Sequence, residues 1–123
     1  MSNTEARLAL RPLLNLAPAE APEESFQNNT LRPIMKMQHE LLVAAFRLSL
    51  QKRKVKLEQL PANQRFDKIK QLITRDARLR GLLLGIAVGQ FTNQEMVYFV
   101  ENESSINRRM TNLLVERLAS AVA

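Results

Sequence analysis

The sequence has no cysteine and only one histidine, His39, among its 123 residues. Without cysteine there can be no disulfides, no thiolate nucleophiles and no thiolate metal ligands. A zinc-binding helix of the protease type needs a second histidine four residues after the first, but position 43 is Val. The carboxylates show no metal-ligand spacing either. We therefore predict no catalytic site, no metal and no cofactor, and hence a protein that is not an enzyme.

Long apolar runs are also missing. The longest, Leu82–Leu84 and Ile86–Val88 around Gly85, fall well short of the roughly 20 residues of a membrane span. Near the N-terminus, Arg7 and Arg11 interrupt the apolar stretch that a signal peptide would need. Hydrophobic residues make up 46% of the chain and charged residues 24%, which are ordinary globular values. We expect one small cytoplasmic domain with no membrane span.

No segment of four or more residues alternates between apolar and polar, so no strand is predicted. The longest helical pattern starts near Thr30, with Pro33 tolerated in the first turn, and continues without interruption to about Lys56. Its expected inward stripe is Ile34, Met37, Leu41, Ala44, Ala45 and Leu48, widened by Met35, Leu42 and Phe46.

Four shorter helices follow. Pro61 opens the second and Asp76 caps the third, which runs to Gly89; Thr92 and Glu95 have capping-box spacing at the start of the fourth. The last begins at Ser104 or Ser105. The expected inward positions of the second, fourth and fifth helices are Phe66, Ile69, Leu72, Ile73, Met96, Phe99, Val100, Ile106, Met110, Leu113, Leu114 and Leu118. The fold class is therefore all-α, a compact bundle of about five helices around a Gly-rich central one.

Residues 1–28 are predicted to be an extended N-terminal arm and linker, and residues 29–123 the helical domain. Prolines punctuate 17–24, which disfavours helix there. A patch of leucines before this linker is more apolar than a solvated tail requires. We expect these leucines to dock either on the chain's own core or on a neighbouring subunit: Leu8, Leu10, Leu13, Leu14 and Leu16.

The third helix carries a small residue at every fourth position, namely Ala77, Gly81, Gly85 and Gly89, and holds all three glycines of the protein. A glycine inside a helix costs about 1 kcal/mol relative to alanine, so some compensation is expected. The spacing places the four on one ridge, where another helix could approach closely. The partner is either the first helix of the same chain or the same ridge of a second copy.

The positive charge is concentrated in one segment. Residues 26–57 carry seven basic side chains and one Glu, which equals the entire net charge of +6. These cations form a candidate face for an anionic partner: Arg32, Lys36, Arg47, Lys52, Arg53, Lys54 and Lys56. The alternative is a solvated basic face, favoured by the helix dipole in the last turns. Base stacking has little support, because the chain has five Phe, one Tyr and no Trp.

Four short stretches are typical of one group of sequences: Ser-Phe-Gln-Asn-Asn-Thr-Leu-Arg-Pro-Ile (25–34), Gly-Gln-Phe-Thr (89–92), Asn-Arg-Arg-Met (107–110) and Glu-Arg-Leu (116–118). Over residues 25–120 the chain resembles a group of short, all-helical bacterial proteins of uncharacterised function that often carry the label glyoxalase. The resemblance implies a shared helical fold. Glyoxalase folds use βαβββ units and His and Glu metal ligands, so no catalytic residue is carried over to this chain.

From these features the sequence predicts a helical interaction module, either a homo-oligomer or an adaptor that binds another protein, with no small-molecule substrate. The alternative is a nucleic-acid-associated accessory protein that uses the basic segment. Salt separates the two: phosphate contacts weaken steeply as salt rises, and an apolar interface does not.

Overall fold

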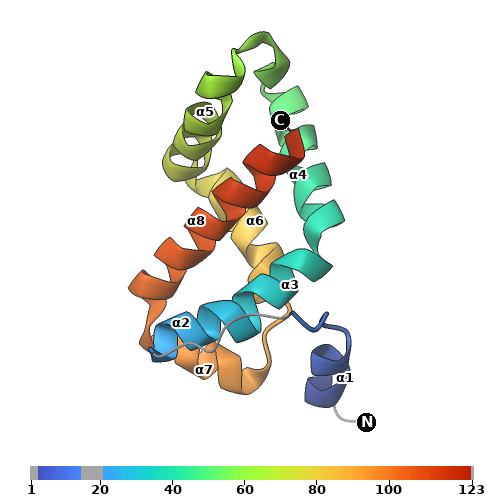
Figure 1. Ribbon diagram of the computed structural model, residues 1–123, viewed down its shortest axis with the longest axis vertical. Coiled ribbons are helices and arrows are strands. Elements are labelled where there is room, and N and C mark those ends of the chain that lie inside the picture. The colour runs from blue at the N-terminus through green and yellow to red at the C-terminus, as the bar shows by residue number, and fades with distance from the viewer. Residues whose placement is uncertain (1–2, 15–20, 123) are drawn as a thin grey trace.

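The computed structural model describes residues 3–14 and 21–122, and these ranges contain helices and connecting turns but no strand. The predicted all-α class is confirmed. No helix within the described ranges is both long and apolar enough to cross a membrane. In Figure 1, α8 (Glu103–Val122) crosses the front of the molecule, with α5 (Ala62–Arg75) and α4 (His39–Lys52) on either side of it. The bundle is completed behind by α6 (Ala77–Val88), which packs against all three.

The lower end of the molecule is formed by the N-terminal segments and α7 (Asn93–Glu101) (Figure 1). Helix α1 (Asn3–Ala9) is followed, after the undescribed residues, by α2 (Pro22–Phe26). From α2 the chain continues through a π-helical turn, η1 (Gln27–Leu31), directly into α3 (Arg32–Met37). Helix therefore begins inside the segment predicted to be an arm, because Phe26 is an apolar anchor that packs on the rings of Phe91 and Tyr98.

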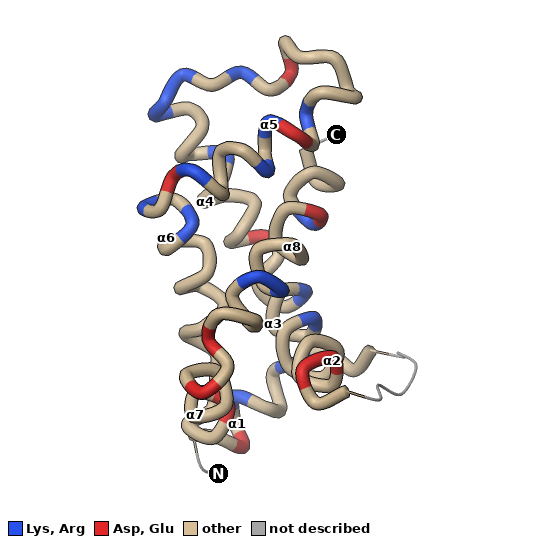
Figure 2. Tube along the Cα trace, turned by 90° about the vertical axis from the view of Figure 1, so that its left-hand side faces the viewer, with Lys and Arg blue, Asp and Glu red and all other residues tan. Residues whose placement is uncertain are grey.

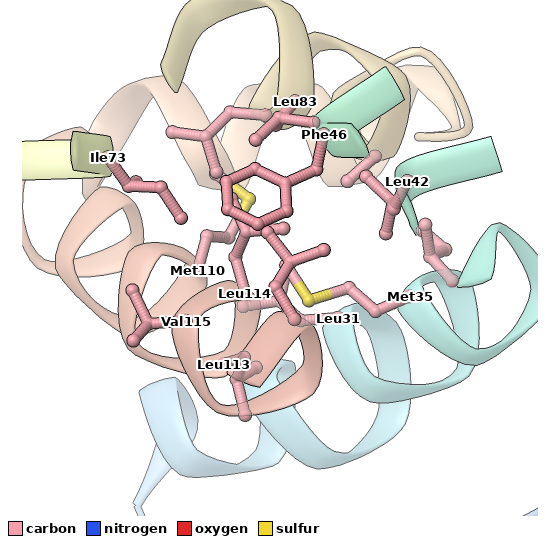
Figure 3. Close-up of a cluster of buried hydrophobic side chains, with 14 of the residues drawn as sticks. Leu31, Met35, Leu42, Phe46, Ile73, Leu83, Met110, Leu113, Leu114 and Val115 are labelled. Carbon is pink, nitrogen blue, oxygen red and sulfur yellow. The ribbon is translucent and has the colours of Figure 1, made fainter. Parts of the chain in front are cut away.

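The hydrophobic core lies where α3, α4, α5, α6 and α8 converge. Phe46 is fully buried at its centre, and Figure 3 shows Leu31, Met35, Leu42, Leu83 and Met110 around it. Helix α8 contributes most of one wall through the positions that the sequence predicted: Ile106, Met110, Leu113, Leu114 and Leu118 are all buried.

The long first helix predicted over 30–56 is not continuous. Gln38 has φ −95° and ψ 13°, outside helical values, and it separates α3 from α4. The preceding π turn has a physical cause. Pro33 lies within a helical run that began at Pro22, and its nitrogen cannot donate a hydrogen bond. In an α-helix its ring would also clash with the carbonyl four residues earlier, and the wider π turn relieves this clash. The helix also ends at Lys52 rather than Lys56.

This break changes which face of α4 points inward. Leu42, Phe46 and Leu50 are buried, whereas Leu41 is 52% exposed and Leu48 is 63% exposed. The predicted inward stripe is thus correct at Ile34 and Met35 in α3 and at Leu42 and Phe46 in α4, and wrong at Leu41, Ala44 and Leu48. Because the helix is interrupted at Gln38, only one edge of the broad stripe extrapolated across the break meets the core.

The predicted starts of α6 and α7 are confirmed at atomic level. The Asp76 carboxylate accepts a 2.9 Å hydrogen bond from the Leu79 amide, which caps α6. Thr92 and Glu95 form both hydrogen bonds of the capping box that begins α7. The inward positions predicted on α5 and α7 are partly wrong, since Phe66 on α5 is 44% exposed and Met96 and Val100 on α7 are 37% and 61% exposed.

Candidate functional site

His39, the single histidine, contacts an arginine of α8. His39 is half-buried at the start of α4, and Arg117 Nη1 lies 3.2 Å from its Nδ1. Because an arginine can only donate, Nδ1 must be the accepting nitrogen of a neutral ring. In the described part of the chain, no group of three His, Asp or Glu side chains is placed to hold a metal ion.

The seven basic residues of the predicted anionic-partner face lie on α3, on α4 and in the segment that follows α4. Arg53 Nη2 pairs with Asp76 at 2.6 Å, which ties the end of α4 to the start of α6. Arg47 Nη2 donates to the Ala121 carbonyl of α8 at 3.3 Å. Lys54 has φ 56°, in the left-handed region, and helps to close the C-terminus of α4. The turn at Gln38 and the end of α4 separate side chains that a continuous helix would have aligned.

The remaining cations of that set lie in different places. Lys36 and Lys52 are exposed, whereas Arg32 borders a groove between α3 and α8. Arg47, Lys54 and Lys56 border another groove, of about 710 Å³, at the end of α4. Three of the seven predicted cations are therefore brought together at this groove.

The small-residue ridge of α6 faces outward. Ala77, Gly81, Gly85 and Gly89 are all exposed, and a Cβ built at Gly81 or Gly85 would meet no other atom within 4 Å. A Cβ at Gly89 would meet only backbone oxygens of α6 itself. None of the three glycines has positive φ, so backbone conformation does not require them. The expected close packing on the first helix is therefore wrong at Gly81 and Gly85.

Exposed apolar residues lie on both α4 and α6; we call Leu41, Leu48, Gly81, Leu82 and Gly85 together the α4/α6 face. Leu82 is 52% exposed, as is Leu41. The two helices pack on each other with opposite directions, since the Arg53–Asp76 pair joins the end of α4 to the start of α6. Arg47 donates to the Ala121 carbonyl of α8, and Leu41 and Leu48 lie on a different side of α4 from Arg47.

On α6 the α4/α6 face consists of Gly81, Leu82 and Gly85, which are all exposed. Figure 2 shows α6 at one side of the molecule and α8 at the other. The buried side of α6, which carries Leu79, Leu83 and Ala87, is directed into the core. At the start of the ridge, Ala77 and Gly81 line a groove of about 620 Å³ together with residues of α8.

The N-terminal arm docks through arginines rather than leucines. Arg11 Nη1 and Nη2 each lie 2.7 Å from a carboxylate oxygen of Glu95, and Arg11 Nη2 also donates to the Gln90 carbonyl. Arg7 donates to the carbonyl oxygen of Phe91. In contrast Leu8 is 48% exposed, Leu10 68% and Leu13 100%, and Leu14 is half-buried. Leu16 lies outside the described residues. Docking on the chain's own core is therefore wrong for Leu8, Leu10 and Leu13, while docking of these leucines on a neighbouring subunit stays a prediction.

Glu95 is the centre of this polar cluster. It accepts hydrogen bonds from Arg11, from the Thr92 backbone and from the Thr30 hydroxyl at 3.1 Å. Burial acts to raise the pKa of Glu95, but the Arg11 and Thr92 hydrogen bonds and the Arg11 charge outweigh it, so the pKa is lowered from its ordinary value of 4.5. The capping-box spacing signalled the local role of Glu95, but nothing in the sequence linked it to Arg11.

Basic residues that the sequence interpretation left aside gather around Arg32. A groove of about 300 Å³ between α3 and α8 is lined by Arg32 and Arg117, and an adjoining one of about 460 Å³ by Arg32, Arg108 and Arg109. The segments 25–34, 107–110 and 116–118 thus meet here, although they are far apart in the chain. All three segments contain arginine, which is the one feature of the sequence that they share. The spacing of these arginines along the chain does not predict that the segments meet.

Comparisons with family models, with curated proteins and with solved structures each found no match to this chain.

Proposed function

We propose that the protein is a cytoplasmic, non-enzymatic interaction module that self-associates, with two copies meeting through the α4/α6 face. The observation that carries the proposal is the outward position of Gly81 and Gly85 on an apolar surface. The absence of cysteine suits a reducing compartment.

The free-energy cost of the glycines supports a second copy as the occupant. Each helical glycine destabilises the monomer by about 1 kcal/mol relative to alanine, and nothing within the described chain offsets this. A ridge without side chains lets another helix approach closely. In a twofold-symmetric pair the same ridge would be present on both partners, so each would supply the space that the other needs.

The exposed leucines add the apolar contact area. Leu41, Leu48 and Leu82 belong to the proposed α4/α6 face and are each at least half exposed in the single chain. Burying them would contribute about 25 cal/mol per Å² of apolar surface. The nucleic-acid alternative has weaker support, because Arg47 and Arg53 are engaged in interactions of the chain itself.

Substitution of Leu82 by Glu tests the proposal directly. We expect the native protein to have twice the chain mass of 14.1 kDa by light scattering, and this mass to be insensitive to salt. Leu82→Glu should give a folded monomer, because the carboxylate would be desolvated in the pair yet remains exposed in the single chain.

Val97→Glu is the matched control, since Val97 is 58% exposed but lies on α7. It should leave the dimer intact. A native monomer at about 100 μM, or equal dissociation by the two variants, would contradict self-association through this face.

Alanine substitutions at Gly81 and Gly85 should act in opposite directions on folding and on association. In the monomeric Leu82→Glu background, each should raise the free energy of unfolding by about 1 kcal/mol, because φ is negative and the added methyl meets nothing. In the native background, the same methyl groups should overpack the contact and weaken the dimer about tenfold. Chemical unfolding and sedimentation measure the two effects. Stabilisation without any loss of association would show that the ridge is not part of the contact.

A further inference from the structure

The groove between α3 and α8 brings together two arginines for which no ion pair is found among the described residues. Arg32 comes from the start of α3 and Arg117 from α8, and both line this cavity of about 300 Å³. Three other arginines of that part of the chain do form ion pairs: Arg11 with Glu95, Arg53 with Asp76 and Arg109 with Glu23 at 3.8 Å. No ion pair forms between Glu116, which borders the same groove, and either Arg32 or Arg117.

Each of the two guanidinium groups is held by a neutral neighbour. Asn28 Oδ1 accepts a 3.1 Å hydrogen bond from Arg32 Nε, and this asparagine belongs to the π turn that precedes α3. His39 Nδ1 accepts from Arg117 Nη1. In both cases an uncharged acceptor positions the cation and leaves other N–H groups of the guanidinium without a protein acceptor. π turns often occur at functional positions of helices.

The two cations raise each other's electrostatic energy. The pKa of Arg117 is lowered, first by burial and then by the charge of Arg32. A bound anion would remove this repulsion. Guanidinium groups present two parallel N–H donors that match the oxygens of a phosphate, and two such groups suit a dianion.

The other residues of the groove limit the size and polarity of the group attached to such an anion. Met35 and Leu113 are buried residues that supply an apolar wall, and Ser120 and Glu116 stand at its exposed positions. Its volume is at the lower end of the range for small-molecule pockets. The occupant must therefore be small and must combine one oxyanion with a short apolar portion.

We propose that the α3/α8 groove binds a small phosphate monoester, with Arg32 and Arg117 contacting the phosphate and Met35 and Leu113 contacting its carbon portion. The sequence predicted no small-molecule ligand, because Arg32 and Arg117 come together only in the folded chain. The site lies on α3 and α8, away from the α4/α6 face, and does not depend on self-association.

Calorimetric titration with phenyl phosphate and with inorganic phosphate, at constant ionic strength, tests this proposal. We expect binding at one site per chain, with phenyl phosphate the tighter of the two. Arg32→Gln and Arg117→Gln should each weaken binding at least tenfold, because each removes charge-assisted hydrogen bonds. Arg75→Gln is the control, since it removes the same charge from an exposed position on α5.

A stability measurement separates ligand binding from a structural role of Arg117. Without phosphate, Arg117→Gln should leave the melting temperature unchanged or raised, because it removes a repelled, half-buried charge. Phosphate should raise the melting temperature of the native protein but not that of this variant. Absence of binding at 10 mM phenyl phosphate, or equal weakening by Arg75→Gln, would overturn the proposal.

Discussion

Replacing Leu42 by alanine is expected to lower the free energy of unfolding by about 2–5 kcal/mol, whereas the same change at Leu41 should cost less than about 0.5 kcal/mol. The two leucines are adjacent on α4, but Leu42 is fully buried beside Phe46 and Leu41 is 52% exposed. Truncation of Leu42 removes apolar contacts and leaves a cavity. Truncation of Leu41 only exposes a smaller side chain to water.

This pair of variants tests the interruption at Gln38, which sets the phase of α4. Both should be measured by urea unfolding in the Leu82→Glu background, so that Leu41 is not affected by association. Phe46→Ala and Leu48→Ala form a second pair on the same helix, with an expected loss of about 3–5 kcal/mol for the first alone. A large loss at Leu41 or Leu48 would indicate the continuous helix that the sequence pattern predicts.

Replacing Glu95 by alanine is expected to cost about 3 kcal/mol, because it removes the partner of a buried cation. The Arg11 side chain is only 6% exposed and Glu95 16%, so the remaining guanidinium would be poorly solvated. The change also removes the capping box of α7 and the hydrogen bond from Thr30. Since α1 has no buried residue, we expect the arm to detach, which proteolysis near Arg7 and Arg11 would detect.

Arg11→Ala separates docking of the arm from capping of α7. It should release the arm in the same way but destabilise the protein less, since Glu95 keeps its bonds to Thr92 and Thr30. If Glu95→Ala and Arg11→Ala have equal effects on unfolding, the capping box contributes nothing measurable.

The pH dependence of stability checks the same cluster. Because the pKa of Glu95 is lower in the folded chain than its ordinary value of 4.5, its ionised form stabilises the fold. This contribution is fully present above pH 4.5 and is lost as the pH falls below that value through the folded-state pKa. The stability difference between the native protein and Glu95→Gln should therefore shrink on acidification; a constant difference would contradict the assignment.

Local signals in the sequence determined the helical class and several helix boundaries. The caps at Asp76 and at Thr92 with Glu95 depend on hydrogen bonds between residues three apart, so spacing alone predicts them. The inward face of α8 could also be predicted from the sequence, because the helix is unbroken from Glu103 to Val122 and a single periodicity applies throughout.

Features that depend on distant parts of the chain were decided only by the tertiary structure. The interruption at Gln38 separates α3 from α4, and of the two adjacent leucines that were both predicted to point inward only Leu42 does so. Arg11 meets Glu95, and Arg32 lies in the same groove as Arg117, over separations of more than 80 residues. A helical period says which side chains share a face; only packing decides whether that face meets the core, another charge or solvent.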